Sequence, residues 1–418
     1  MVFLKTFIIL TDMSDKNKIP SGWHKIPIGD CIVERKKSPI KVDDATNFGQ
    51  YPFFTSGDTV LKHITNLVEG ENIYLATGGT ANVKYYDGKS AYSTDTYVVC
   101  GNEKCDTKFL YYALLLLKDY INTNYFQGSG LKHLQKKDFK KHELIIPVSV
   151  DEQKRIADAL SKMDDAIAQS DSMIEKYELI KTGLMQDLLT FGIDENGNIR
   201  SEQTHKFKDS PIGRIPEEWE VVLFGNLTNN GCKMQTGPFG TQLHVYDYAD
   251  SGVPMINPKD IQNNKIIDDD IIFVKNEKAS DLAKYKATTG DLLVARKGDV
   301  KKLAVVDASH DGVLCGSDCI LIKLPKILPA SFFFLYYQTH NFMKEVVIQS
   351  VGTTLPTLKP AILRELHVPI VPFDEQNRIH SSINKIESLI DKEKGCKYKL
   401  ESQRFGTISD LVTGNVRI

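Results

Sequence analysis

The 418-residue sequence has no apolar run that approaches the roughly 18 residues needed to span a bilayer, so we predict no membrane segment. Its first ten residues are mostly apolar, but they lack the charged leading region and small-residue cleavage site of a signal peptide. We interpret residues 1–18 as an N-terminal extension, with Met13 as an alternative start to Met1. The hydrophobic content of 41% and charged content of 25% are typical of a soluble globular protein, and the length suggests two to four domains.

Cysteines are few and follow no pairing pattern. There are seven, an odd number, and no C-x-x-C pair is accompanied by a second pair or by suitably spaced histidines. A disulfide framework and a zinc site of familiar spacing are therefore not supported. We expect free, mostly buried thiols in a reducing cytoplasm; they are Cys31, Cys100, Cys105, Cys232, Cys315, Cys319 and Cys396.

Common catalytic motifs are also missing. The chain has no G-x-x-x-x-G-K-[ST] phosphate loop, no G-x-S-x-G elbow and no H-E-x-x-H pair. No glycine-rich turn follows a strand in the manner of a dinucleotide or methyl-donor cofactor site. The segment 257–260, NPKD, lacks the second proline and the aromatic residue of the amino-methyltransferase motif. We therefore predict no catalytic residues, no metal ligands and no cofactor bound by this chain.

The net charge of −2 argues against a strongly basic nucleic-acid-binding domain. The basic residues are nevertheless clustered, whereas the stretch 151–190 is acidic. A charge run is most often a solvated face, so these clusters alone do not establish a binding site. One cluster holds Lys132, Lys136, Lys137, Lys140 and Lys141 with His133 and His142, and the other holds Arg296, Lys297, Lys301 and Lys302.

The chain does contain a repeat of its own first half. The sequence DEQKRI at residues 151–156 returns as DEQNRI at 374–379, 223 residues later. With the same offset, DLLT at 187–190 returns as DLVT at 410–413. An Ile-Pro pair followed by tryptophan occurs at Ile19, Pro20 and Trp23 and again, 196 residues later, at Ile215, Pro216 and Trp219. Because the offset changes, the segments between these anchors differ in length.

Residues 151–190 predict a long helix. Ser149 and Glu152 fit a capping box at its start. Forty residues at about 1.5 Å each give a helix of roughly 60 Å. Ser170 and Lys181 interrupt an apolar seam whose initial 4, 3, 4 spacing is typical of a coiled coil; the seam runs through Ile156, Leu160, Met163, Ile167, Ile174, Tyr177, Leu184 and Leu188.

Residues 374–413 predict the second copy of this helix. The 4, 3, 4 spacing recurs at Ile379, Ile383, Ile386 and Ile390, while Lys397 occupies a seam position and Gly395 weakens the helix locally. A single amphipathic helix of this length needs a partner for its apolar stripe. We therefore expect the two helices to pair, and to run antiparallel because a whole head separates them in the chain.

The segments before each helix predict two mixed α/β heads. Strand-like runs occur at 72–75 and 97–99 in the first head, which also has a helical pattern at 109–120. Similar runs occur at 271–274 and 292–295 in the second head, with a helical pattern at 330–347. The expected fold is α+β with a pseudo-twofold internal repeat and an antiparallel coiled coil. Its predicted parts are an extension 1–18, a first head 19–150, a helix 151–190, a linker 191–214, a second head 215–373, and a second helix with the tail 374–418.

Polar, glycine-containing loops occupy related places in the two heads. Backbone amides, lysines and threonine hydroxyls can hold phosphates, whereas Gln, Asn and Arg can read base edges. The alternative is that these loops are ordinary turns. The candidate DNA-binding residues of the first head are Thr77, Gly78, Gly79, Thr80, Lys84, Ser129, Gly130, Lys132 and His133. Those of the second head are Thr236, Gly237, Phe239, Thr241, Gln242, Arg296, Lys297, Lys301, Thr353 and Thr354.

The ordered set of motifs resembles the specificity (S) subunits of type I restriction–modification systems, over almost the whole chain. The Pro-x-x-Trp entries look like the opening of each target recognition domain of that family. The segments 237–241, GPFGT, and 290–298, GDLLVARKG, resemble two of its recognition-domain loops. The D-E-Q-x-R-I starts and the N-x-R exits at 198–200 and 415–417 are similar to the ends of its conserved spacer helices. The first head departs from the pattern, because it has YPFFTSG at 51–57 in place of the GPFGT loop.

The resemblance implies a DNA-recognition subunit that is not itself catalytic. It implies double-stranded DNA, two methyltransferase (M) subunits and restriction (R) subunits as partners, with S-adenosylmethionine, ATP and Mg used by those partners. Two unlike heads on paired helices further suggest an asymmetric, bipartite target with a gap set by the helices. The competing hypotheses are an enzyme, either nuclease or methyltransferase, and a coiled-coil-armed tandem scaffold that binds proteins but not DNA.

Overall fold

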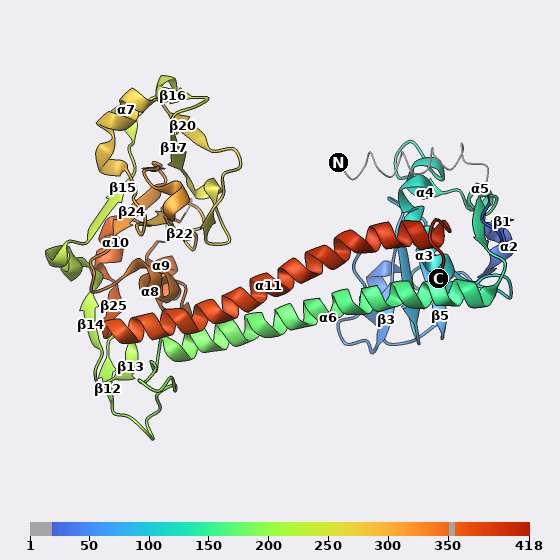
Figure 1. Cartoon of the computed structure of the whole chain (residues 1–418), viewed down its shortest axis with the longest axis horizontal. Helices are drawn as coiled ribbons and strands as arrows, with labels where there is room; N and C mark the ends of the chain where they lie inside the picture. Colours follow the sequence, from blue (N-terminus) through green and yellow to red (C-terminus); the bar gives the residue numbers. More distant parts are fainter. Residues whose placement is uncertain (1–18, 351–355) are drawn as a thin grey trace. The chain divides into compact units, whose positions relative to one another are not determined.

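The computed structural model describes residues 19–350 and 356–418 and divides the chain into two compact units (Figure 1). Among the described residues, unit 1 comprises 19–173 and 393–418, and unit 2 comprises 174–350 and 356–392. Each unit boundary falls inside a long helix: α6, Val150–Leu188, or α11, Phe373–Val412. Each unit therefore contains one head and a part of both long helices.

The head of unit 1 is built on a four-stranded antiparallel sheet in the order β2-β8-β5-β6. A three-stranded sheet, β4-β3-β7, and the pairs β1-β11 and β9-β10 complete the strands. The strands are β1 Trp23–Pro27, β2 Ile32–Glu34, β3 Tyr51–Phe54, β4 Leu61–His63, β5 Glu71–Ala76, β6 Val83–Asp87, β7 Ala91–Tyr92, β8 Thr96–Gly101, β9 Phe126–Gln127, β10 His133–Leu134 and β11 Glu143–Pro147. The helices are α2 Ile28–Cys31, α3 Thr107–Leu116, α4 Lys118–Asn124 and α5 Lys136–Phe139.

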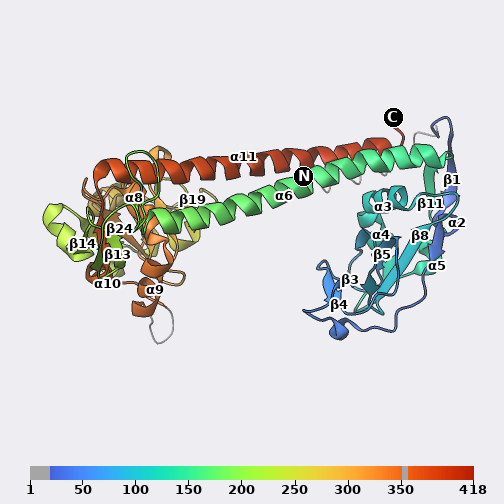
Figure 2. The ribbon, with the colours of Figure 1, turned by 90° about the horizontal axis from the view of Figure 1, so that it is seen from below.

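Helix α3 covers the sheet of unit 1 and also packs against the long helices (Figure 2). Its buried residues, including Phe109 and Leu114, join one core with Ile156 of α6 and Ile408 of α11. The N-terminal and C-terminal segments of unit 1 are thus held together because they bury apolar side chains in the same core.

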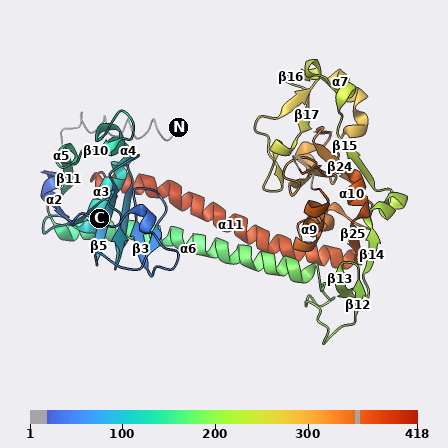
Figure 3. The same ribbon diagram turned by 180° about the vertical axis from the view of Figure 1, so that it is seen from behind.

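The head of unit 2 contains two four-stranded sheets, β15-β24-β21-β22 and β16-β20-β17-β23, and three two-stranded pairs. The strands are β12 Phe207–Ser210, β13 Gly213–Pro216, β14 Glu220–Leu223, β15 Lys233–Thr236, β16 Tyr248–Ala249, β17 Val253–Ile256, β18 Ile261–Gln262, β19 Lys265–Ile266, β20 Ile272–Val274, β21 Leu292–Ala295, β22 Leu303–Val305, β23 Leu314–Cys315, β24 Cys319–Lys323 and β25 His367–Ile370. The helices are α7 Asn276–Asp281, α8 Ala330–Tyr337, α9 His340–Gln349 and α10 Pro360–Glu365, of which α7, α9 and α10 are labelled in Figure 3.

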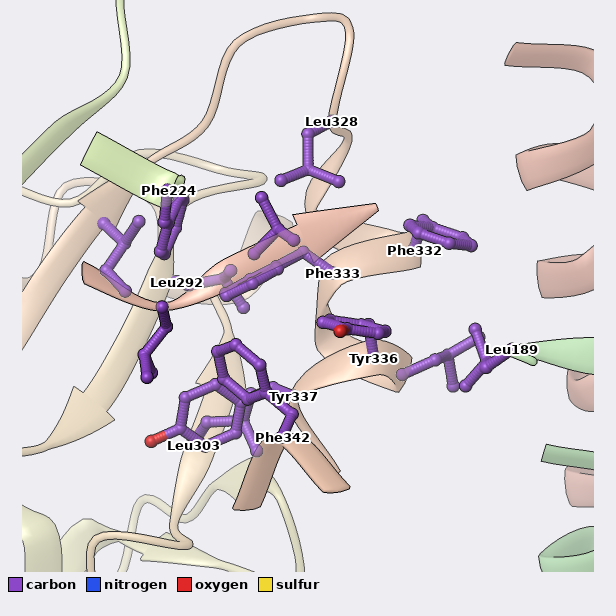
Figure 4. Close-up of a cluster of buried hydrophobic side chains, with 14 of the residues drawn as sticks. Leu189, Phe224, Leu292, Leu303, Leu328, Phe332, Phe333, Tyr336, Tyr337 and Phe342 are labelled. Atoms are coloured by element: carbon purple, nitrogen blue, oxygen red, sulfur yellow. The ribbon is translucent and has the colours of Figure 1, made fainter. Parts of the chain in front are cut away.

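Aromatic residues of α8 and α9 form much of the core of unit 2 (Figure 4). Phe333 lies 4.8 Å from Phe224 and 5.8 Å from Phe342, measured between ring centroids. Leu189, just after α6, and Ile379 of α11 belong to the same buried cluster. The head and the helix ends within this unit therefore share one apolar core.

The two long helices pair in an antiparallel coiled coil, as the sequence predicts. Within unit 1, Asp164 of α6 contacts Arg404 of α11, and seven residues later Asp171 contacts Lys397, also seven residues earlier in α11. Within unit 2, Lys181 contacts Glu387. As the position along α6 rises, the position of its partner falls, which is the signature of opposite directions. The predicted fold class is confirmed.

Two of the shorter predicted helices are interrupted. The helix expected at 109–120 is divided at Leu117, and that expected at 330–347 is divided at Gln338 and Thr339. At the second break the Thr339 hydroxyl donates to the carbonyl oxygen of Tyr336 at 2.8 Å. A side chain that bonds to the end of one helix in this way competes with helix continuation.

The helix start at Ser149 also differs from the expectation. The Glu152 backbone N–H lies 3.4 Å from the Ser149 hydroxyl, but the Glu152 carboxylate bonds to Arg417 instead of completing a capping box. At the other helix, Gly395 does not interrupt α11. Packing of the long apolar stripe therefore outweighs the low helix propensity of one glycine.

Candidate nucleic-acid interface

Three separate loops meet in the first head. The Thr77 N–H donates to the Asp95 carbonyl oxygen at 3.1 Å, and the Thr77 carbonyl oxygen accepts from the Leu134 N–H at 3.0 Å. The Gly79 N–H donates to the Lys132 carbonyl oxygen at 2.9 Å. We call this arrangement the three-loop cluster of head 1. It joins the candidate loop after β5 to the candidate loop that contains β10.

The second head repeats this arrangement bond for bond. The Arg296 N–H donates to the Asp318 carbonyl oxygen at 2.7 Å, and the Arg296 carbonyl oxygen accepts from the Leu358 N–H at 2.7 Å. The Gly298 N–H donates to the Pro356 carbonyl oxygen at 3.2 Å. This is the three-loop cluster of head 2. Arg296 thus occupies the place that Thr77 has in head 1.

The same backbone frame carries different side chains in the two heads. A single bridge pairs Gly78 with His133 in head 1, and the equivalent bridge pairs Lys297 with Thr357 in head 2. His133 is exposed, and the Lys297 side chain keeps 46% of its surface accessible. One backbone arrangement that occurs in both heads but carries unlike side chains can present two different chemical patterns to a ligand.

The loop at Gly237 follows strand β15 and lies next to the three-loop cluster of head 2. Its N–H donates to the Cys319 carbonyl oxygen at 3.2 Å. A Cβ at this position would lie 2.0 Å from the Gly316 carbonyl oxygen, so only glycine allows this close approach. Thr236 precedes it in β15, and Phe239 follows it with 61% of its surface exposed.

Acidic residues moderate the charge of both basic clusters. Lys297 forms an ion pair with Asp318 at 3.0 Å. In head 1, Lys140 pairs with Glu34 at 2.8 Å and Lys141 with Asp138 at 3.1 Å. The pKa of Lys136 is lowered, chiefly by burial. The clusters are therefore mixed surfaces and not continuous positive patches.

Lys84 has a structural environment. Its ammonium group donates to the backbone carbonyl oxygens of Thr55, at 3.1 Å, and of Gly57. Burial is the main cause that lowers its pKa. These bonds hold the loop after β3 against β6. The Lys84 ammonium group is therefore used within the head and is not positioned to bind DNA.

The other candidates surround the clusters without joining their hydrogen bonds. Ser129 and Gly130 lie exposed in the turn between β9 and β10, and Thr80 is exposed beside Gly79. In head 2, Thr241 and Lys301 are exposed, and Gln242 accepts a hydrogen bond from the Tyr285 hydroxyl. Thr353 and Thr354 lie outside the described residues.

Sequence reasoning missed Asp95 and Asp318, which anchor the two clusters through their carbonyl oxygens. They lie 223 residues apart, the offset of the long helices, and this spacing was the available signal. It also missed the partners of the repeated Glu-Gln pair. Gln153 donates to the Pro147 carbonyl oxygen at 2.8 Å, which ties the start of α6 to the end of its own head.

The second member of each repeated helix start, Glu152 or Glu375, meets the arginine of an N-x-R exit. Arg417 donates to Glu152 in unit 1, and Arg200 donates to both carboxylate oxygens of Glu375 in unit 2. The Trp23 indole N–H also donates to Glu152, at 3.3 Å. We call these contacts the Glu–Arg junctions. In each junction the arginine that follows one long helix binds the glutamate at the start of the other. In unit 1, Trp23 connects the junction to the head as well.

Residues 19–350 and 356–418 contain no group of three or more His, Cys, Asp or Glu side chains placed to hold a metal ion. In the same part of the chain, no helix is both long and apolar enough to cross a membrane. All seven cysteines are free thiols, as expected, and five of them are buried.

Comparison with known proteins shows two matching regions. Residues 20–176 and 216–402 match the family described as type I restriction modification DNA specificity domain. A type I restriction enzyme specificity subunit from Methanocaldococcus jannaschii, MjaVIII, is 25% identical over 96% of this chain and 94% of its own length. The EcoDI specificity subunit from Escherichia coli is 23% identical over 89% of this chain and 82% of its own length.

Solved structures show the same fold. The S subunit of a type I restriction–modification system from M. genitalium has a TM-score of 0.60 at 17% identity, covering 95% of this chain and 97% of that chain. A chain from a structural study of assembly and conformational transition of the type I R-M system has a TM-score of 0.56 at 13% identity, covering 96% of this chain and 100% of that chain.

Proposed function

Because the chain belongs to the type I restriction modification DNA specificity family, we propose that it selects an asymmetric, bipartite DNA target, one half with each head. The observation that carries this proposal is the repeated three-loop cluster. Equivalent backbone bonds hold Thr77 with His133 nearby in head 1, and Arg296 with Lys297 in head 2. Different side chains on one frame favour two different half-sites.

Arg296 is the residue best suited to read a base in head 2. Its backbone is fixed on both sides by hydrogen bonds to Asp318 and Leu358. Its Nε is buried and, among the described residues, no group accepts a hydrogen bond from it. The terminal nitrogens of an arginine whose backbone is fixed can form the bidentate contact with guanine that is common in major-groove recognition.

In this proposal the chain contributes recognition and no catalytic residues. Two M subunits would dock on it and bring S-adenosylmethionine, and R subunits would bring ATP- and Mg-dependent activity. The modest net charge of −2 supports this division, because a chain without a strong positive field needs partners to enclose a duplex tightly. The paired helices α6 and α11 would set the gap between the half-sites.

The test is methylome sequencing of cells with the intact M subunit, with and without this chain. We expect one bipartite methylated motif that disappears when the chain is removed. Exchange of residues 19–147 for the first head of another specificity subunit should change one half of the motif only. If the exchanged protein keeps both original halves, the assignment of one half-site to each head is wrong. If no methylation depends on the chain, the recognition function itself is wrong.

A further inference from the structure

The middle of the helix pair contains a hydrogen bond between two equivalent positions of the repeat. The Ser170 hydroxyl donates to the Glu393 carboxylate at 2.7 Å, and the two residues are 223 positions apart. This is also the offset between the two D-E-Q-x-R-I helix starts. A residue that contacts its own repeat equivalent lies at the pseudo-twofold axis. Serine therefore faces glutamate at the one place where a symmetric pair would have identical residues.

The ion pairs that flank this layer along the helices follow the repeat. Asp164 pairs with Arg404, and Lys181 pairs with Glu387 at 2.7 Å. Shifting Asp164 by the repeat offset gives Glu387, and shifting Lys181 gives Arg404. Each helix thus carries one acid and one base at equivalent positions. The same ion pairs would form between two copies of α6 or two copies of α11, so they do not determine which helices pair.

The central layer does distinguish the helices. Beside the Ser170–Glu393 bond, Asp171 forms an ion pair with Lys397 at 2.6 Å. This bond is the main cause that raises the pKa of Lys397. The repeat equivalent of Asp171 is Lys394, and the equivalent of Lys397 is Ile174. The charges at the centre of α11 therefore have no counterpart of the same sign in α6.

Applying the repeat relation gives the contacts of each like-with-like pair. Two copies of α6 would place Ser170 against Ser170 and Asp171 against Ile174, so these two contacts bring no like charges together. Two copies of α11 would place Glu393 against Glu393 and Lys397 against Lys394 on both sides of the axis. Glu393 is only partly exposed, and like charges in contact at a helix interface are destabilising.

We propose that the central layer, formed by the Ser170–Glu393 and Asp171–Lys397 contacts, prevents α11 from pairing with α11 of a second copy of the chain. Helix α11 then pairs with α6. Helix α6 by itself is compatible with α6 of a second copy, so the selectivity resides in Glu393 and Lys397. The contact between unlike helices then keeps two unlike heads in one particle. That consequence for DNA rests on the proposed function, whereas the choice of helix partner does not.

The experiment uses the full chain with a protease site inserted in the exposed turn between Glu202 and Gln203. The folded protein is cleaved and incubated in urea just below its unfolding midpoint, which allows the fragments to exchange. Native mass spectrometry then counts unlike and like pairs of the two fragments. We expect the wild-type protein to remain almost entirely as unlike pairs.

The central variant Glu393→Ser, Lys394→Asp, Lys397→Ile gives α11 the central residues of α6. It should approach the statistical mixture, in which about half of the particles are unlike pairs. The matched control Arg404→Lys alters a flanking ion pair without changing its sign, and its pairs should remain unlike. A wild-type protein that exchanges to the statistical mixture, or a central variant that stays fully unlike, would overturn the proposal.

A second variant covers the case in which the central variant does not fold. Ser170→Glu with Glu393→Ser moves the carboxylate to the other helix and keeps the cross-helix bond. Its pairs should remain unlike, whereas Ser170→Glu alone sets Glu against Glu in every possible pairing and should lower the share of unlike pairs toward the statistical half. Equal behaviour of these two proteins contradicts the proposal. The readout contains no DNA, so a failure of DNA recognition with unlike pairs intact counts against the proposed function alone.

Discussion

Arg417, next to the last residue of the chain, donates hydrogen bonds to both carboxylate oxygens of Glu152, at 2.9 and 3.1 Å. Its guanidinium also donates to the Ser21 carbonyl oxygen at 2.9 Å. In unit 2, Arg200 and Glu375 form the equivalent junction. Head 1 is followed in the chain by α6, but its junction contains Arg417, which follows α11. Head 2 is followed by α11, but its junction contains Arg200, which follows α6.

The two Glu–Arg junctions should differ in their contribution to stability. The side chains of Arg200 and Glu375 are only 9% and 1% exposed, whereas that of Arg417 is 49% exposed. Breaking a buried pair leaves an uncompensated charge and costs roughly 3–5 kcal/mol. In the other junction the Glu152 side chain is itself only 10% exposed, but it also accepts from the Trp23 indole N–H, and water reaches the half-exposed Arg417, so the cost should be smaller. Arg200→Ala should therefore lower the free energy of unfolding far more than Arg417→Ala, as measured by urea denaturation. Equal losses would contradict this account.

Arg296→Ala and Lys297→Ala should weaken binding to the cognate DNA. For Arg296, loss of one base contact corresponds to about 1–3 kcal/mol, or about 5- to 150-fold in affinity. Lys297 already pairs with Asp318, so its loss should have a smaller effect that depends on salt. Fluorescence anisotropy of the assembled methyltransferase complex measures both. Lys208→Ala, at an exposed site in β12, is the matched control and should bind like the wild type.

The length of the paired helices should set the gap of the DNA target. Adding one heptad to α6 within 156–188 and one to the paired stretch of α11 lengthens the pair by about 10 Å. That corresponds to about three base pairs. Methylation-site mapping should show a wider gap between two unchanged half-sites. An unchanged gap would count decisively against this role, while loss of methylation with a stable protein would indicate a defect in subunit docking.

His310 should make the stability of unit 2 depend on pH. Burial alone would lower its pKa, but contacts with Asp307 at 2.8 Å and Asp268 at 3.0 Å outweigh it and raise the pKa above 6.5. A raised pKa means that the stabilisation is fully present below the unfolded value and is lost as pH rises through the folded value.

The corresponding measurement is the urea midpoint of the wild type and of His310→Gln from about pH 5.5 to about pH 8.5. The advantage of the wild type should shrink as the pH rises. Asp307 does not interfere in this range, because hydrogen bonds from Ser309 and His310 lower its pKa to about 2. A difference between the two proteins that is constant with pH would contradict the prediction.

Most of the helical frame could be predicted because its signals are local and periodic. The 4, 3, 4 spacing from Ile156 to Ile167 and the repeated D-E-Q-x-R-I starts depend only on neighbouring residues. Interruptions such as the break at Thr339 could not be foreseen. They arise where one side-chain hydrogen bond competes with the next helical turn, and flanking residues do not decide that competition.

The order of the residues is enough to predict that the chain is a repeat, that two long helices pair, and that glycine-containing loops recur in both heads. Which of these loops meet is visible only in the folded chain. Folding brings Thr77 to Leu134 and Arg296 to Leu358, and the structure shows Lys84 to be committed to backbone carbonyls. The physical reason is that periodicity is written in adjacent residues, whereas a cluster of loops depends on backbone bonds between strands distant in the chain.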